Sequence, residues 1–256
     1  ADADGNADGS GGALTMADGS SVNSGSATIT LSADGDITVG RVITTNNTSQ
    51  AVTITSTSGA LLDAGDTGGA DIVAAGANAV VTITTATGIG STTTTTTTDN
   101  ALETEITTLV VTVTDSGNVN IVETDAIDLA SVTTAAGSIT IASGGTLMAT
   151  DIDSSTTDDD SDDISLTTTA GDIAVVSINA GSVNDVTLTS AGTITEDGDA
   201  ATVLTADVLT ATAGGAITLD TTVATADLAT SAAGDIDIDE TDSIDLAKVT
   251  TADGSI

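Results

Sequence analysis

The chain has 256 residues drawn from an unusually narrow alphabet, with no aromatic residue, no Pro, no Cys and no His. It contains 38 acidic residues and only two basic ones, Arg41 and Lys248, so the formal net charge is −36. Nucleic acids are bound through clustered Lys and Arg, and anionic membranes attract basic segments, so this charge argues against both as partners. The missing Cys and His also exclude disulfides, thiolate metal sites and the usual hydrolytic nucleophile–base pairs.

High charge without aromatic residues is typical of disorder, but the aliphatic content indicates a fold. Hydrophobic residues make up 39% of the chain. They occur as short β-branched runs separated by Gly, Asp, Asn and Ser, a pattern typical of strands joined by turns. No run approaches the roughly 18 apolar residues of a membrane helix, so we expect no membrane insertion. The pattern predicts strands around a thin, regular core.

The first segment, residues 1–26, is rich in Gly and Asp and does not fit the pattern that follows. We interpret it as an acidic partial coil or linker. Its alternating oxygen side chains resemble the start of an EF-hand loop, although Ala7 stands where the loop Gly belongs and Ala13 where the closing Glu belongs. The candidate calcium ligands here are Asp2, Asp4, Asn6 and Asp8.

From residue 27 to residue 256, short strands alternate inward aliphatic and outward polar side chains. The segments 29–31, 37–39, 52–54, 139–141 and 236–238 all read apolar–polar–apolar. A Gly precedes an apolar strand at fairly regular intervals, and we expect it to supply positive φ at corners. The predicted fold is therefore all-β, a right-handed parallel β-helix (β-solenoid) with about 20–24 residues per coil and loop excursions.

The alternative fold is an array of β-sandwiches, whose domains run to about 100 residues. Such domains normally bury an aromatic residue, and their strands would not recur with so short a period. We therefore favour the continuous solenoid.

Outward Thr-x-Thr pairs recur along the strands. A flat ladder of such pairs can order water and bind ice, but their irregular spacing in the sequence argues against one flat face. The pairs are Thr28/Thr30, Thr53/Thr55, Thr82/Thr84, Thr112/Thr114 and Thr187/Thr189.

A longer repeat is also visible. Residues 117–139 and 234–256 are identical at 16 of 23 positions. Weaker pairs of segments start at Ala27 and Asp162 and at Ala51 and Asp185, with a longer offset than the first pair. The long repeat therefore measures about 117–135 residues, because loops have gained or lost residues while the strands persisted. Because the sequence stops inside a repeated motif, we expect this chain to be a piece of a longer one.

The segments 100–129, 133–147, 169–175 and 190–200 resemble the repeats of filamentous haemagglutinin-like giant bacterial surface proteins. The resemblance covers nearly all of residues 27–256. It implies a right-handed parallel β-helix that is secreted or held at the cell surface and acts in adhesion, fibres or matrix. The resemblance does not identify a receptor to which the protein would bind.

A second candidate calcium site lies in an expected loop excursion. Oxygen-only carboxylate clusters suit calcium, which takes six to eight ligands. The alternative is that these residues form solvating turns of an acidic surface. The residues are Asp158, Asp159, Asp160, Asp162 and Asp163.

Carboxylate-based glycan cleavage is the one enzymatic option that the composition leaves. The neighbours Asp235 and Asp237, or Asp242 and Asp245, are candidates for paired carboxylates. Sugars are usually gripped by aromatic faces, and the chain has none, so we expect no enzyme. Apart from calcium we expect no cofactor.

The sequence therefore predicts an extracellular structural or adhesive fibre protein. Open coil ends favour self-association end to end, and lateral association into fibres is a further possibility to test. Cell-surface glycans and neighbouring cells are the expected adhesive partners. The alternative function is a module that binds calcium or, less readily, ice or glycans on the same scaffold.

Overall fold

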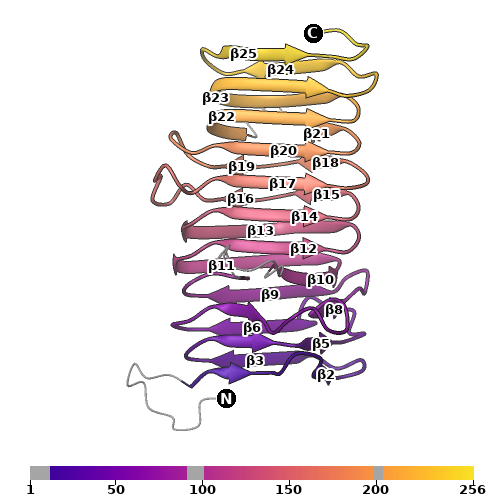
Figure 1. Ribbon diagram of the computed structural model, residues 1–256, viewed down its shortest axis with the longest axis vertical. Helices are drawn as coiled ribbons and strands as arrows, with labels where there is room; N and C mark the ends of the chain where they lie inside the picture. Colours follow the sequence, from indigo (N-terminus) through magenta and orange to yellow (C-terminus); the bar gives the residue numbers. More distant parts are fainter. Residues whose placement is uncertain (1–11, 91–100, 199–203) are drawn as a thin grey trace.

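A computed structural model describes residues 12–90, 101–198 and 204–256. All regular structure in these residues is β: parallel strands stack as a solenoid of about 10 coils with roughly 22 residues each. Figure 1 shows the coils piled along the long axis, from indigo strands at one end to yellow strands at the other. The predicted parallel β-solenoid is confirmed, and the array of sandwiches is wrong.

The strands are short, and most pair in parallel with a strand of the preceding coil and a strand of the following coil. They are β1 (Leu14–Thr15), β2 (Ser21–Asn23), β3 (Ile29–Ala33), β4 (Ile37–Val39), β5 (Arg41–Ile43), β6 (Val52–Ser56), β7 (Leu61–Asp63), β8 (Ile72–Ala74), β9 (Val80–Thr85), β10 (Leu102–Ile106), β11 (Thr108–Ser116), β12 (Val119–Glu123), β13 (Ile127–Ala136), β14 (Ile139–Ser143), β15 (Leu147–Ala149), β16 (Ile152–Asp153), β17 (Ile164–Thr168), β18 (Ile173–Val175), β19 (Ile178–Asn179), β20 (Val186–Ser190), β21 (Ile194–Glu196), β22 (Leu204–Ala213), β23 (Ile217–Thr230), β24 (Ile236–Glu240) and β25 (Asp245–Thr250).

One column of aliphatic side chains runs from the first described coil to the last. Its members, each in parallel register with the next, are Leu14, Ile37, Leu61, Ile89, Val119, Ile139, Ile164, Val186, Leu209, Ala226 and Leu246. Their spacing in the sequence is uneven: Ala226 follows Leu209 closely, whereas a much longer segment separates Ile89 from Val119. Neighbouring strands nevertheless lie about 4.8 Å apart, so the ten steps span about 48 Å. Loops absorb the differences in coil length.

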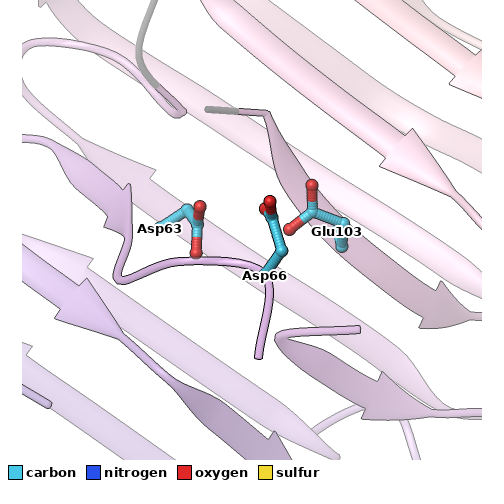
Figure 2. A group of neighbouring side chains, drawn as sticks. All are labelled: Asp63, Asp66 and Glu103. Carbon is cyan, nitrogen blue, oxygen red and sulfur yellow. The ribbon is translucent and has the colours of Figure 1, made fainter. Parts of the chain in front are cut away.

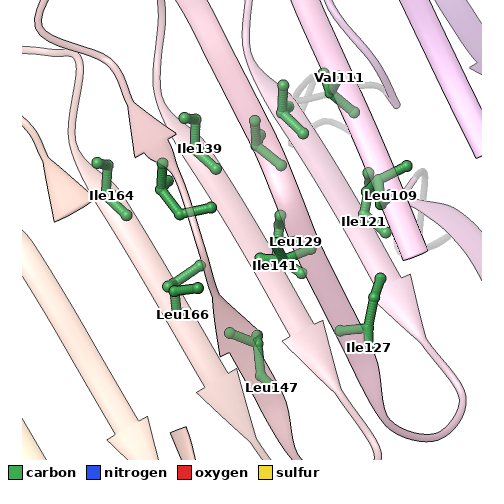
Figure 3. Packing of buried hydrophobic residues seen from close by; sticks show 14 of the residues in the cluster. Leu109, Val111, Ile121, Ile127, Leu129, Ile139, Ile141, Leu147, Ile164 and Leu166 are labelled. Atoms are coloured by element: carbon green, nitrogen blue, oxygen red, sulfur yellow. The ribbon is translucent and has the colours of Figure 1, made fainter. Parts of the chain in front are cut away.

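The core is built from the inward half of each strand. In β6, Val52 and Ile54 are fully buried, while Thr53 and Thr55, which alternate with them, face outward and are half-buried. Figure 3 shows the inward aliphatic side chains of successive coils gathered in one interior. Fully burying one such side chain contributes about 1.5–3 kcal/mol. A core without aromatic residues is sufficient because every coil adds several aliphatic side chains to the same continuous spine.

The recurring Gly residues mark a corner where successive coils touch through their backbones. The Gly192 amide donates to the Gly171 carbonyl at 2.8 Å, and the Gly215 amide donates to the Gly192 carbonyl at 2.8 Å. A Cβ on Gly117 would overlap the carbonyl of Thr87 in the preceding coil. The expectation of positive φ holds for Gly171 but not for Gly117, Gly192 or Gly215. At Gly117 and Gly192, Gly is required by close approach of backbones, whereas a Cβ at Gly215 would meet only the Thr193 methyl group at 3.0 Å.

The solenoid already includes part of the acidic N-terminal segment. Strands β1 and β2 pair in parallel with β4 and β5 of the next coil. Residues 12–26 therefore contribute to the first described coil.

Candidate functional site

Three carboxylates from two neighbouring coils come together beside β10. Asp63 ends β7, Asp66 lies in the turn that follows, and Glu103 lies on β10 in the next coil. Their carboxylate oxygens lie within 4.8 Å of one another, the single such group of three in the described part of the chain. Figure 2 shows Asp66 placed between the other two. Asp63 and Glu103 are half-buried and Asp66 is exposed, so the group is open on one side.

A fourth carboxyl lies beneath this group. Asp71 is only 1% exposed, and its Oδ2 accepts a hydrogen bond from the Glu103 amide at 3.2 Å. The Asp71 amide in turn donates to the Glu103 carbonyl at 2.8 Å. Burial, reinforced by the charges of Asp63 and Glu103, raises the pKa of Asp71 to about 8. Asp71 is therefore largely protonated at neutral pH.

This arrangement suits a hard cation chemically. Calcium prefers carboxylate and carbonyl oxygens and accepts water for its remaining positions. The sequence analysis missed this cluster because Asp63 and Glu103 are far apart in the sequence and lie on separate coils. Only the register between the coils brings them together, and no local spacing signals it.

The predicted calcium residues of the loop between β16 and β17 bind turns of the following coil. Asp158, whose φ of 46° is the one positive value among described residues other than Gly, accepts hydrogen bonds from the Ser182 amide at 2.9 Å and hydroxyl at 3.0 Å. Asp163 accepts one from the Asp185 amide at 2.9 Å. These carboxylates act here as caps between coils.

The other members of that loop divide into buried and exposed residues. Asp162 is 3% exposed and accepts a hydrogen bond from the Thr157 hydroxyl at 2.7 Å, while its amide donates to Asn184 Oδ1 at 3.1 Å. Asp159 and Asp160 are exposed. Calcium binding at this loop stays a prediction. The other predicted ligands, Asp2, Asp4, Asn6 and Asp8, lie outside the described residues.

One of the carboxylates considered for hydrolysis is also engaged with the next coil. Asp235 Oδ1 accepts hydrogen bonds from the Ser255 amide at 2.7 Å and the Ser255 hydroxyl at 2.8 Å. These hydrogen bonds hold the pKa of Asp235 below its ordinary value.

The last described coil presents apolar side chains that the same motif buries elsewhere. Leu129 and Leu246 occupy equivalent positions in the long repeat, yet Leu129 is fully buried and Leu246 is 53% exposed. The coil that contains β14 and β15 covers β12 and β13, whereas β25 has no strand on its far side among the described residues. The resulting hollow is lined by the apolar residues Leu228, Ile236, Ile238, Ile244, Leu246, Val249 and Ile256, together with Asp237 and Glu240.

The fold defines this chain as a parallel β-solenoid repeat protein. Comparison with known proteins finds no matching family model, no similar characterised protein and no similar solved structure. None of the described residues forms a helix long and apolar enough to cross a membrane.

Proposed function

We propose that this chain is an extracellular structural or adhesive fibre protein, secreted or held at the cell surface, that forms an elongated acidic rod. The observation that carries the proposal is the uninterrupted aliphatic column from Leu14 to Leu246. Each added coil lengthens such a core along one axis only. The repeated pattern of inward aliphatic residues therefore serves to build an elongated rod. The resemblance to haemagglutinin-like surface repeats supports the same role. We propose no catalytic activity.

The charge of the rod favours assembly through its ends over assembly through its sides. With a net charge of −36, parallel rods repel one another within the screening length of about 8–10 Å at physiological salt. The last described coil, in contrast, presents apolar side chains and the edge of β25, which no other described strand covers. A further coil of the same kind, from the same chain or from a second copy, fits this surface. We therefore propose end-to-end self-association, with cell-surface glycans or neighbouring cells as adhesive partners.

Solution scattering of the purified chain tests the assembly. We expect a rod whose maximum dimension grows with protein concentration in steps of one chain length. Leu246→Lys places a charge in the terminal hollow and is expected to restrict the protein to single rods. Met148→Lys is the matched control, because Met148 is 43% exposed on β15 in the middle of the rod. A length that is independent of concentration, or equal effects of the two variants, would contradict end-to-end assembly.

Divalent-cation binding is the second candidate function, and the convergence of Asp63, Asp66 and Glu103 within 4.8 Å is the observation that favours it. A bound cation would relieve repulsion between carboxylates of two coils and tie those coils together. Calorimetric titration with calcium tests it.

A further inference from the structure

Outward polar side chains form two parallel columns on the face made by β3, β6, β9, β11 and β13. The first column, in register from coil to coil, contains Ser32, Thr55, Thr84, Thr112 and Thr133. The second column lies two residues earlier on each strand and contains Thr30, Thr53, Thr82, Val110 and Ser131. Nine of these ten side chains carry a hydroxyl group.

The irregular spacing of the Thr pairs in the sequence argued against a single face, and the structure corrects that argument in part. Ser32, Thr55, Thr84, Thr112 and Thr133 are unevenly spaced along the chain, yet they stack in one column. Loops between the strands absorb the variation. Only Thr53/Thr55 and Thr82/Thr84 lie in the columns as complete pairs. Thr28 and Thr114 fall outside them. Thr187/Thr189 lies on β20, which pairs with β17 and β22 instead.

The part of this face made by β3, β6 and β9 is uncharged on a rod that is otherwise strongly acidic. These three strands contain no charged residue, and the first one in β11 is Asp115, beyond both columns. Carboxylates begin at β13, where Asp128 lies outside the columns and Ser131 donates a hydrogen bond to Asp151 at 3.1 Å. The hydroxyls of Thr53, Thr55, Thr82 and Thr84 make no hydrogen bond to another described residue. They are therefore available to a partner outside the chain.

The geometry points to ice as that partner, and we propose that this face binds it. Side chains two residues apart on a strand are separated by about 6.6 Å, and those on neighbouring strands by about 4.8 Å. Both distances are close to repeats of oxygen positions on ice surfaces. Branching at Cβ restricts the rotamers of Thr, so each side chain presents its methyl and hydroxyl in a fixed direction. The face is thus a preorganised array that can hold a matching layer of ordered water.

Other partners fit this face less well. Polysaccharides are usually held against aromatic rings, and the chain has no aromatic residue. A second copy of the rod would bring two acidic molecules side by side along their length. Ice requires neither aromatic residues nor charge, only regular spacing and area.

The full chain can be tested by freezing a dilute solution slowly and measuring the fraction of protein taken into the ice, together with inhibition of ice recrystallisation. The variant Thr55→Lys with Thr84→Lys places long charged side chains on two adjacent strands of the column. Its matched control is Met148→Lys with Ala174→Lys, because these two outward residues also stack in register one coil apart. We expect uptake and inhibition for the wild type and the control, and loss of both for the Thr variant.

A variant that keeps the shape isolates the hydroxyl groups. Thr55→Val with Thr84→Val preserves size and branching, and we expect weaker inhibition of recrystallisation. Circular dichroism and thermal unfolding confirm that each variant retains the solenoid.

Several results would overturn the proposal. These are exclusion of the wild type from ice, equal loss in the two Lys variants, and full activity of the Val variant. Two others would identify a different partner: retention on insoluble cellulose without ice uptake, or dimerisation that Thr55→Lys with Thr84→Lys abolishes without ice uptake. None of these measurements depends on end-to-end assembly, since Leu246 lies outside this face.

Discussion

The carboxylate of Glu123 accepts a hydrogen bond from the hydroxyl of Thr104 at 2.6 Å, which ties two successive coils together inside the rod. The same carboxylate also accepts one from the Ile106 amide at 3.2 Å. Both partners of the first bond are buried, Glu123 at 1% exposed and Thr104 at 0%. A polar contact of this kind is stabilising in the interior because each member satisfies the other.

The contact recurs in the second copy of the long repeat. Glu240, the counterpart of Glu123 in that copy, accepts hydrogen bonds from the Thr221 hydroxyl at 2.8 Å and from the Val223 amide at 3.2 Å. In both copies the partners lie at the same two separations before the glutamate. The glutamate is therefore part of the repeat itself, as a tie between coils.

Burial raises the pKa of Glu123 to about 7, and this makes stability depend on pH. Because the folded pKa lies above the unfolded value, the protonated form is favoured in the fold. The stability that Glu123 contributes to the fold is fully present below about pH 4 and is lost as pH rises through about 7. We expect Glu123→Gln to remove about 1–3 kcal/mol of this pH dependence, measured as urea unfolding midpoints between pH 4 and pH 8.

The second repeat copy supplies the control for that experiment. Glu240 makes the same hydrogen bonds at a half-buried position, so Glu240→Gln is the matched variant that removes the same carboxylate from the other copy. An unchanged pH profile in Glu123→Gln would show that this carboxyl does not titrate with folding.

The aliphatic column permits a comparison within one set of stacked side chains. Ile139→Ala removes a fully buried side chain from the middle and is expected to cost about 2–5 kcal/mol of unfolding free energy. Leu246→Ala, at a position 53% exposed at the end of the same column, should stay within about 0.5–1 kcal/mol. Denaturant unfolding measures both. Similar losses at the two positions would contradict a core that is closed in the middle and exposed at the last described coil.

The Gly corner gives a test of backbone packing. In Gly117→Ala the new Cβ would overlap the carbonyl of Thr87, so the coils must separate locally and the protein should be strongly destabilised. Gly25→Ala is the comparison, since open space surrounds Gly25 and the cost is the strain of its φ of +61°, about 1 kcal/mol. In thermal unfolding, the melting temperature of Gly117→Ala should lie well below that of Gly25→Ala. The reverse order would rule out close approach as the reason for Gly at the corner.

Calcium titration tests the carboxylate group of β7 and β10. If Asp63, Asp66 and Glu103 bind the ion, a calcium concentration about 100-fold above the dissociation constant should raise stability by about 2.7 kcal/mol. Asp66→Asn removes one ligand charge and should weaken binding in calorimetry. Asp239→Asn removes an exposed carboxylate of β24 elsewhere and should leave it unchanged. Equal binding in both variants would place calcium at another site.

The elements of this fold were largely predictable from local sequence. The alternation Val52-Thr53-Ile54 indicates one buried and one outward face of a strand, and the structure has that arrangement. The regular Gly residues marked the corners, although close approach rather than backbone conformation explains several of them, such as Gly117. Both signals are local because they depend on side-chain alternation and backbone contact at one position.

Contacts between coils were not predictable in the same way. The meeting of Asp63 with Glu103, and the stacking of Thr84 on Thr112, depend on how many residues each loop holds outside the strands. Local patterns do not encode that number, and coil lengths vary too much for a fixed period to supply it. Ile89 illustrates the difficulty, since it maintains the aliphatic column through isolated bridges and lies in no strand.

Because the coils can differ in length, the length of the rod depends on the number of coils and not directly on the number of residues. Adding residues to a loop, as between β16 and β17, changes what projects from the side without lengthening the axis. Extending the axis requires a whole further turn of inward side chains. Evolution of such a chain can therefore alter its lateral decoration and its reach independently, the first by small insertions and the second by duplication of complete turns.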